Sequence, residues 1–79
     1  MTRSVFTANY DKFRQMLVDA RTSIGVTQVE LAQKLDRPQS YVSKFERRER
    51  RLDVVELLEV LKALGLDSVE FITRLNGDA

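Results

Sequence analysis

Apolar side chains recur at steps of three and four along most of the chain, the spacing that places them on one face of an α-helix. The first series consists of Phe6, Tyr10, Phe13, Leu17, Ala20 and Ile24. Thr7 is a suitable N-cap for this helix, and Gly25 ends it, because glycine takes the left-handed conformation at low steric cost. No alternation of apolar and polar residues is long enough to indicate a strand. The pattern therefore predicts an all-α fold.

Each of three later helices begins with a capping-box pattern, in which an N-cap residue is followed three positions later by glutamate. The three pairs are Thr27 with Glu30, Asp53 with Glu56, and Asp67 with Glu70. Such pairs satisfy the free amide groups of a first helical turn. We expect these helices over residues 28–34, 54–64 and 68–75, with Gly65 and Gly77 ending the last two. Their expected inward-facing residues are Val29, Leu31, Ala32 and Leu35 in the first and Val54, Leu57, Leu58, Leu61 and Leu64 in the second.

A further helix fits between the first two of these and begins at Pro38, because proline's fixed φ and missing N–H do no harm in a first turn. Its inner face is formed by Val42 and Phe45, three residues apart. The last helix is too short for all its apolar side chains to face one core. We expect Phe71 and Leu75 to lie in a dimer interface, although a longer contact with the first helix explains the same residues.

Only three residues, 35–37, separate the helix over 28–34 from the helix that begins at Pro38. Two short helices joined by a three- to four-residue turn form a helix-turn-helix, here at about residues 28–47. In such a motif the second helix can lie in the major groove of DNA while the first crosses the backbone. The spacing therefore predicts a nucleic-acid interface on the second helix.

The outer face of this second helix carries hydrogen-bonding side chains. They are Gln39, Ser40, Ser43 and Lys44, with Tyr41 near the same edge. Glutamine can bond adenine in bidentate fashion, serine pairs with several bases, and lysine reaches guanine O6 and N7. We therefore predict that these five residues read base edges, the alternative being an ordinary polar helix face. For Tyr41, partial burial of an amphipathic ring is an equally good interpretation.

Charge is distributed unevenly, although 13 Lys and Arg residues nearly balance 12 Asp and Glu residues. Residues 37–51 contain six basic and two acidic side chains, whereas residues 52–79 contain two basic and six acidic ones. A basic segment beside such a helix is expected to neutralise phosphates. The arginines predicted to bind phosphates are Arg37, Arg47, Arg48, Arg50 and Arg51. A solvated charged loop is the alternative for this cluster.

The chain contains neither cysteine nor histidine. Disulfides, Cys/His zinc sites, thiol nucleophiles and imidazole bases are therefore excluded, and we expect no metal, no cofactor and no enzymatic activity. The length of 79 residues suits one domain over residues 1–79. No apolar run approaches the roughly 18–20 residues that a membrane span needs, and the N-terminus lacks a signal-peptide pattern. We expect no membrane association and a cytoplasmic location.

The segments Thr27–Leu35 and Gln39–Arg47 resemble the phage-repressor type of helix-turn-helix, that of the xenobiotic-response-element (XRE) regulators. The segments Arg50–Leu58 and Lys62–Leu66 continue the match, which runs over about residues 13–75. The resemblance implies a five-helix, lambda-repressor-like domain that binds operator DNA as a symmetric dimer. It also implies that Gln28 contacts a phosphate, aided by the N-terminus of its helix.

Four other positions are informative in the light of this resemblance. Arg21 and Glu46 match positions that pair in some relatives and tie the first helix to the end of the DNA-binding helix. Asp36 and Arg48 occupy places where relatives often have glycine. Aspartate tolerates a positive φ better than most residues, but less well than glycine.

The expected function is sequence-specific regulation of transcription. A homodimer would bind an inverted-repeat operator in double-stranded DNA, with the helix that begins at Pro38 in the major groove. One alternative is an antitoxin or other protein-interaction module of the same fold, with a partner protein. Only residues 76–79 follow the last expected helix, which argues against a toxin-neutralising tail. Another alternative is a restriction–modification controller protein, a special case of the expected function.

Overall fold

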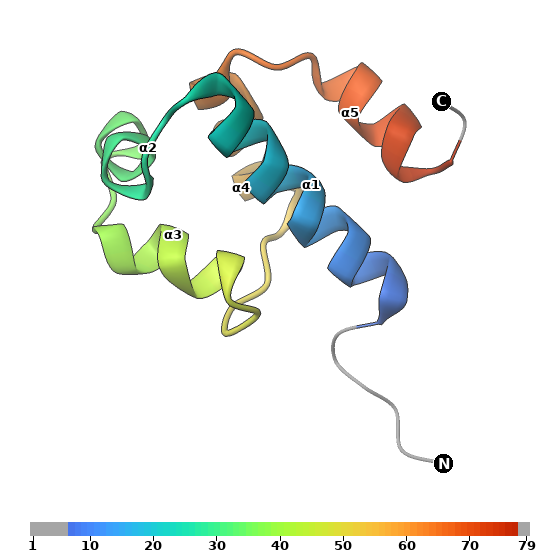
Figure 1. Ribbon diagram of the computed structural model, residues 1–79, viewed down its shortest axis with the longest axis horizontal. Coiled ribbons are helices and arrows are strands. Elements are labelled where there is room, and N and C mark those ends of the chain that lie inside the picture. The colour runs from blue at the N-terminus through green and yellow to red at the C-terminus, as the bar shows by residue number, and fades with distance from the viewer. Residues whose placement is uncertain (1–6, 78–79) are drawn as a thin grey trace.

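The described residues, 7–77 of a computed structural model, form five helices joined by short turns (Figure 1). The helices are α1 (Ala8–Ile24), α2 (Gln28–Leu35), α3 (Gln39–Glu46), α4 (Val54–Leu64) and α5 (Ser68–Leu75). Residues 7–77 contain no strand, so the prediction of an all-α fold with five helices is confirmed. Within the same residues, no helix is long and apolar enough to cross a membrane.

Most helix ends follow the capping signals of the sequence, but at the start of α5 only the Asp67 half of the expected capping box forms, with Asp67 Oδ1 accepting from the N–H groups of Val69 and Glu70. Thr7 Oγ1 accepts a hydrogen bond from the Tyr10 N–H at 3.2 Å, and capping boxes are complete at the starts of α2 and α4. Pro38 is the N-cap of α3 and lies just outside the helix that was expected to begin with it. Gly25, with φ of 83°, ends α1 in the left-handed conformation, where glycine has no Cβ to clash.

Asp36 and Arg48 take the left-handed conformation, with φ of 56° and 68°. A non-glycine residue pays roughly 1–2 kcal/mol for this geometry. At Asp36 the cost is offset by two backbone hydrogen bonds, in which its N–H donates to the carbonyls of Ala32 and Gln33 at the end of α2. Both turns therefore have the positive φ that glycine favours, although neither Asp36 nor Arg48 is a glycine.

One stripe of each helix forms the core. α1 crosses the molecule with α2 and α3 on one side and α5 on the other (Figure 1). The most deeply buried side chains come from four of the helices and are Leu17, Leu31, Val42, Phe45, Val60 and Leu61. Met16, Ala20 and Leu35 pack against this core and are partly buried. The core therefore holds α2 and α3 rigidly against α1.

Several expected core positions are exposed, and these expectations were wrong. On α4 the buried stripe is Leu57, Val60, Leu61 and Leu64, whereas Val54 and Leu58 face outward. The buried residues follow the i, i+3, i+4, i+7 pattern, and Leu58 lies about 100° away from that stripe. Ile24 and Val29 are also exposed, and Phe6 lies outside the described residues.

Phe71, which was expected in a dimer interface, lies in the core. It is 7% exposed, and its ring packs edge-on against Phe13 of α1 with ring centroids 6.2 Å apart. Leu75 shares this inner stripe at spacing i+4 and is partly buried. The exposed apolar side chains of α5 are instead Val69 and Ile72. The packing of α5 on α1 decides this orientation.

Candidate nucleic-acid interface

The α2–turn–α3 unit presents one face of α3 to solvent. Ala32 is small and buried where α2 meets α3, and the Arg37 N–H donates to its carbonyl at 2.9 Å. Val42 and Phe45 occupy the inner face of α3, 0% and 2% exposed. Since the inner face is fully packed, the opposite face of α3 must point outward.

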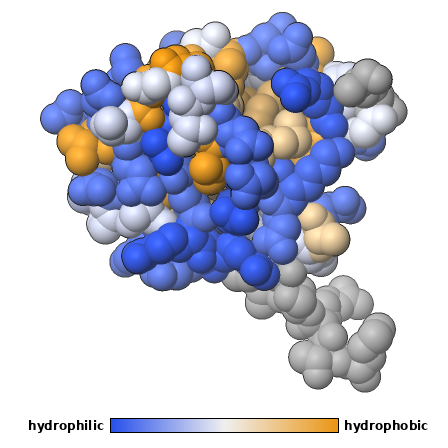
Figure 2. Space-filling view, in the orientation of Figure 1, coloured by the Kyte–Doolittle hydropathy of each residue, from blue (hydrophilic) through white to orange (hydrophobic). Residues whose placement is uncertain are grey.

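Four of the five expected base-reading residues lie on that outward face. Gln39, Ser40 and Lys44 are exposed, and Ser43 is partly exposed, with its Oγ donating to the Ser40 carbonyl at 3.3 Å. Strongly hydrophilic residues cover the edge of the molecule along α3 and the segment that follows it (Figure 2). The outward face of α3 therefore offers both hydrogen-bond donors and hydrogen-bond acceptors to a ligand.

Tyr41 does not belong to this exposed set, because it is only 8% exposed. Its ring packs edge-on against Phe45, with centroids 5.7 Å apart. The guanidinium carbons of Arg37 and Arg50 lie 4.6 and 4.9 Å from the centre of the Tyr41 ring. Burial raises the pKa of Tyr41, so its hydroxyl stays neutral. The structure thus supports the interpretation of Tyr41 as a buried ring.

A buried ion pair supports the exposed face from behind. Both oxygens of Glu46 accept from Arg21, Oε2 from Nε at 2.6 Å and Oε1 from Nη2 at 2.9 Å, which confirms the expected pair. Gln28 Nε2 donates to the same Oε1 at 2.8 Å, and Gln39 Nε2 lies 3.4 Å from Gln28 Oε1. A chain of hydrogen bonds therefore runs from the core to the first residue of α3.

Arg14 was not identified from the sequence. Its Nη1 donates to the carbonyl of Glu46 at 2.8 Å, which satisfies a free carbonyl at the end of α3. The available signal was its spacing, since Arg14 and Arg21 are seven residues apart and share one face of α1. Two arginines of α1 therefore hold the last residue of α3.

Two of the expected phosphate-binding arginines, Arg47 and Arg48, directly follow the end of α3. Arg47 is exposed, and its Nε lies 3.4 Å from Glu49 Oε2. Arg48 Nε lies 3.0 Å from Asp11 Oδ1, and both side chains are well exposed. Surface pairs of this kind are weak and exchange easily for a phosphate. These arginines are therefore positioned at the surface but not locked there.

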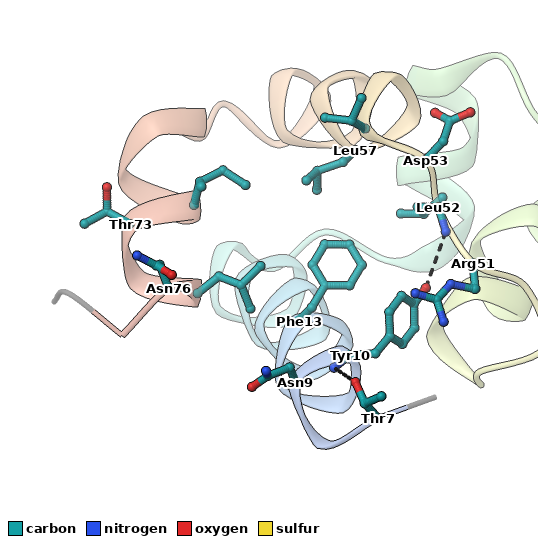
Figure 3. A pocket seen from close by; sticks show the side chains of 13 residues that line it. Thr7, Asn9, Tyr10, Phe13, Arg51, Leu52, Asp53, Leu57, Thr73 and Asn76 are labelled. Carbon is teal, nitrogen blue, oxygen red and sulfur yellow. Dashed lines mark hydrogen bonds between the residues drawn. The ribbon is translucent and has the colours of Figure 1, made fainter. Parts of the chain in front are cut away.

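The segment that carries Arg51 is anchored to α1 through Tyr10. The Leu52 N–H donates to the Tyr10 hydroxyl at 3.3 Å, and the Arg51 guanidinium carbon lies 4.3 Å from the centre of the Tyr10 ring. Figure 3 shows both contacts beside a cleft of about 700 Å³ between α1, α4 and α5. The sequence indicated Tyr10 only as a core residue, but its hydroxyl also accepts the hydrogen bond that anchors the segment carrying Arg51.

Arg50 differs from its neighbours because both of its terminal nitrogens are held by one carboxylate. Nη1 donates to Glu56 Oε1 at 3.0 Å and Nη2 to Oε2 at 2.7 Å. The Arg50 guanidinium, followed by the Asp53 backbone N–H, lowers the pKa of Glu56 to about 2. Arg37 makes a longer approach to Glu59, at 4.0 Å. Glu56 thus remains ionised and bound at any ordinary pH.

Comparison with known proteins gives matches over most of the chain. A family model described as helix-turn-helix matches residues 17–71. An XRE-family like protein from Pseudomonas syringae pv. tomato str. DC3000 has 43% sequence identity and a TM-score of 0.86, over 89% of this chain and 85% of that chain. The search of curated proteins found no match.

The restriction–modification controller protein C.Esp1396I is also similar. Its wild-type structure has 28% identity and a TM-score of 0.81, over 91% of this chain and 95% of that chain. The same protein was solved as a tetramer in complex with its natural 35 base-pair operator, with 28% identity, a TM-score of 0.80 and the same shares of both chains. Helices and turns therefore superpose on solved structures almost from end to end.

Proposed function

Because the chain belongs to the XRE family of helix-turn-helix proteins, we propose that it regulates transcription by binding operator DNA in a sequence-specific way. The outward face of α3 carries this proposal. It exposes Gln39, Ser40 and Lys44 while Val42 and Phe45 bury the opposite side. A helix held in this way fits the major groove with its polar side chains against base edges.

Base contacts and phosphate contacts divide between two sets of residues. We assign base reading to Gln39, Ser40 and Lys44, with Ser43 beside them. The proposed phosphate contacts are Gln28, Arg47, Arg48 and Arg51. Arg50 is left out of this set because Glu56 holds both of its terminal nitrogens, and Arg37 because it lies near Glu59 as well as against the Tyr41 ring. Phosphate contacts set register and affinity, whereas base contacts set specificity.

A second copy of the chain is the proposed partner on DNA. Apolar side chains are exposed on both helices, namely Val54, Val55 and Leu58 on α4 and Val69 and Ile72 on α5, and we propose that they form one surface. Val54 and Ile72 line the same cleft, so this α4–α5 surface is continuous across the two helices. A symmetric dimer through it can bind both half-sites of an inverted-repeat operator only if it places two copies of α3 about 34 Å apart, which is one turn of B-DNA. C.Esp1396I was solved as an operator-bound tetramer, which is consistent with assembly on DNA.

A binding titration tests the proposed function. The protein is expected to bind a duplex selected from a random DNA pool at least about a thousandfold more tightly than an unselected duplex at the same stated salt concentration. Affinity for both duplexes is expected to fall linearly on a logarithmic plot as salt rises, because phosphate contacts release counterions. Equal affinity for both duplexes would contradict the proposed function.

Ile72→Asp is expected to weaken the homodimer, because it puts a charge into the α4–α5 surface. Sedimentation should show more monomer, and affinity for the inverted repeat should fall at least about tenfold while affinity for a single half-site stays unchanged. Ile24→Asp is the control, since Ile24 is similarly exposed, at 48% against 43% for Ile72, but lies outside this surface. A dimer of unchanged strength in Ile72→Asp would show that the interface is elsewhere.

The similarity to C.Esp1396I favours a controller protein as a special case of this function. No feature of the interface favours an antitoxin over a regulator. The family acts by binding DNA, and we infer that this member has no catalytic activity. A regulator of this kind works where its operator lies, so we place it in the cytoplasm.

A further inference from the structure

We propose that Arg50 and Glu56 position α3 for DNA binding, and that Arg50 is not a phosphate contact. Together with Tyr41 and Arg37 they form a group of four side chains, called here the Tyr41 cluster, which links α3 to the first turn of α4. The inference rests on the proposed function, because its consequence is measured as DNA binding.

The first observation is how α3 is supported. Its Cα atoms lie near those of α1 and α2, but none is within 8 Å of a Cα atom of α4. α4 carries much of the proposed dimer surface. α2 packs on both α3 and α4, and side chains that bridge α3 and α4 add a second connection that helps to set the orientation of α3 relative to the dimer axis.

The Tyr41 cluster supplies such a bridge. Tyr41 belongs to α3, and the guanidinium carbon of Arg50 lies 4.9 Å from the centre of its ring. Arg50 in turn makes its two hydrogen bonds to Glu56 on α4, at 3.0 and 2.7 Å. Glu56 is itself held, because its Oε1 also accepts from the Asp53 N–H at 3.0 Å in the capping box. Each link is a charged or aromatic contact of defined geometry.

The same hydrogen bonds leave Arg50 poorly suited to a phosphate. Nη1 donates to the Arg51 carbonyl at 2.9 Å as well as to Glu56, and Nη2 is used by Glu56. Freeing the guanidinium would leave the Glu56 carboxylate without its bidentate partner next to DNA, where a glutamate of ordinary pKa is still ionised at neutral pH. A phosphate contact here would therefore break several good interactions and leave an ionised carboxylate unpaired.

Arginine substitutions distinguish the two roles through the salt dependence of operator binding. Arg50→Met is expected to weaken operator binding about five- to tenfold without changing the slope of log affinity against log salt. Arg50→Lys should lose almost as much, since lysine cannot make the bidentate pair. At Arg47, the matched control, methionine should reduce the slope by about one and lysine should preserve binding.

Glutamate substitutions test the same idea with the opposite sign of charge. Removing a negative charge near DNA should strengthen binding if only long-range electrostatics matter, and Glu49→Gln is expected to do so slightly. Glu56→Gln is expected to weaken operator binding about fivefold instead, because Arg50 loses its ionised partner. In Glu56→Gln the glutamine oxygen can still accept from the Asp53 N–H, so the capping box is kept. This variant therefore tests the inference even if Arg50→Met fails to fold. A thermal melt followed by circular dichroism checks folding of every variant.

Three results would each overturn the inference: Arg50→Lys binding like the unmodified protein, Arg50→Met reducing the salt slope by about one, or Glu56→Gln binding more tightly. The loss should also be larger on the operator than on unselected DNA, because a misdirected α3 loses base contacts first. Failure of the proposed function is a separate outcome, since the unmodified protein would then bind selected and unselected duplexes equally.

Discussion

Glu46→Ala is expected to lower the free energy of unfolding by about 3–5 kcal/mol, the loss typical of breaking a buried ion pair. Glu46 is 7% exposed, and both of its oxygens are bound by Arg21. Without the carboxylate, the Arg21 charge stays partly buried with no anion, and Gln28 loses its 2.8 Å acceptor. Such a loss is comparable to the whole stability of many small domains. Urea denaturation followed by circular dichroism measures it.

Glu49→Ala is the matched control for this prediction. Glu49 lies three residues further along, but its ion pair with Arg47 is on the surface, with both side chains more than half exposed. Exposed pairs contribute only about 0–1 kcal/mol. If Glu46→Ala cost no more than Glu49→Ala, the buried pair would not support the end of α3 as argued.

Gln39→Ala is expected to cost about 1–3 kcal/mol of operator binding and to remove the preference at one base pair. Gln39 is the first residue of α3, exposed, and its amide lies beside Gln28. Gln28 is held in turn by the buried Glu46, so the Gln39 side chain is oriented before DNA arrives. The measurement is the affinity for a set of operators, each with one base pair changed.

Gln33→Ala controls for the loss of a glutamine as such, because Gln33 is exposed on α2, on the other helix of the motif. It should leave the pattern of preferences unchanged. A Gln39→Ala protein that binds all the operators equally more weakly would mean that Gln39 contacts the backbone and that α3 enters the groove in another orientation.

Helix positions were predictable because the signals for them are local. The capping pairs at Thr27 and Asp53 and the stop at Gly65 involve residues at most four apart, and the structure reproduces those helix starts and that stop. The family was also recognisable, since the spacing of the motif residues survives in the sequence. The assignment of residues to bases and phosphates stays a prediction.

The orientation of individual side chains was less predictable. α3 and α5 have eight residues each, so two turns offer few apolar positions from which to judge which side faces the core. Tyr41 and Phe71 were therefore expected nearer the surface than they are. Their burial depends on Phe45, Phe13 and the arginines, which come from other turns or other helices.

The role of Glu56 shows the same limit. Its place three residues after Asp53 explains one oxygen by a local rule, and the structure confirms that hydrogen bond. Both oxygens also bind Arg50, which lies six residues before Glu56, in the segment between α3 and α4. Nothing in the spacing of Arg50 and Glu56 distinguishes this arginine from Arg47, Arg48 or Arg51.

The amino-acid sequence by itself determined the helices, their caps, the family and the polar face of α3, because neighbouring residues and helical periodicity decide these. Only the tertiary structure decided which arginines are held within the protein, which ring is buried and which apolar residues remain for a partner. Those outcomes depend on contacts such as Arg14 with the Glu46 carbonyl and the Tyr10 hydroxyl with the Leu52 N–H, 32 and 42 residues apart. Packing brings such groups together, and the sequence around each residue does not indicate these contacts.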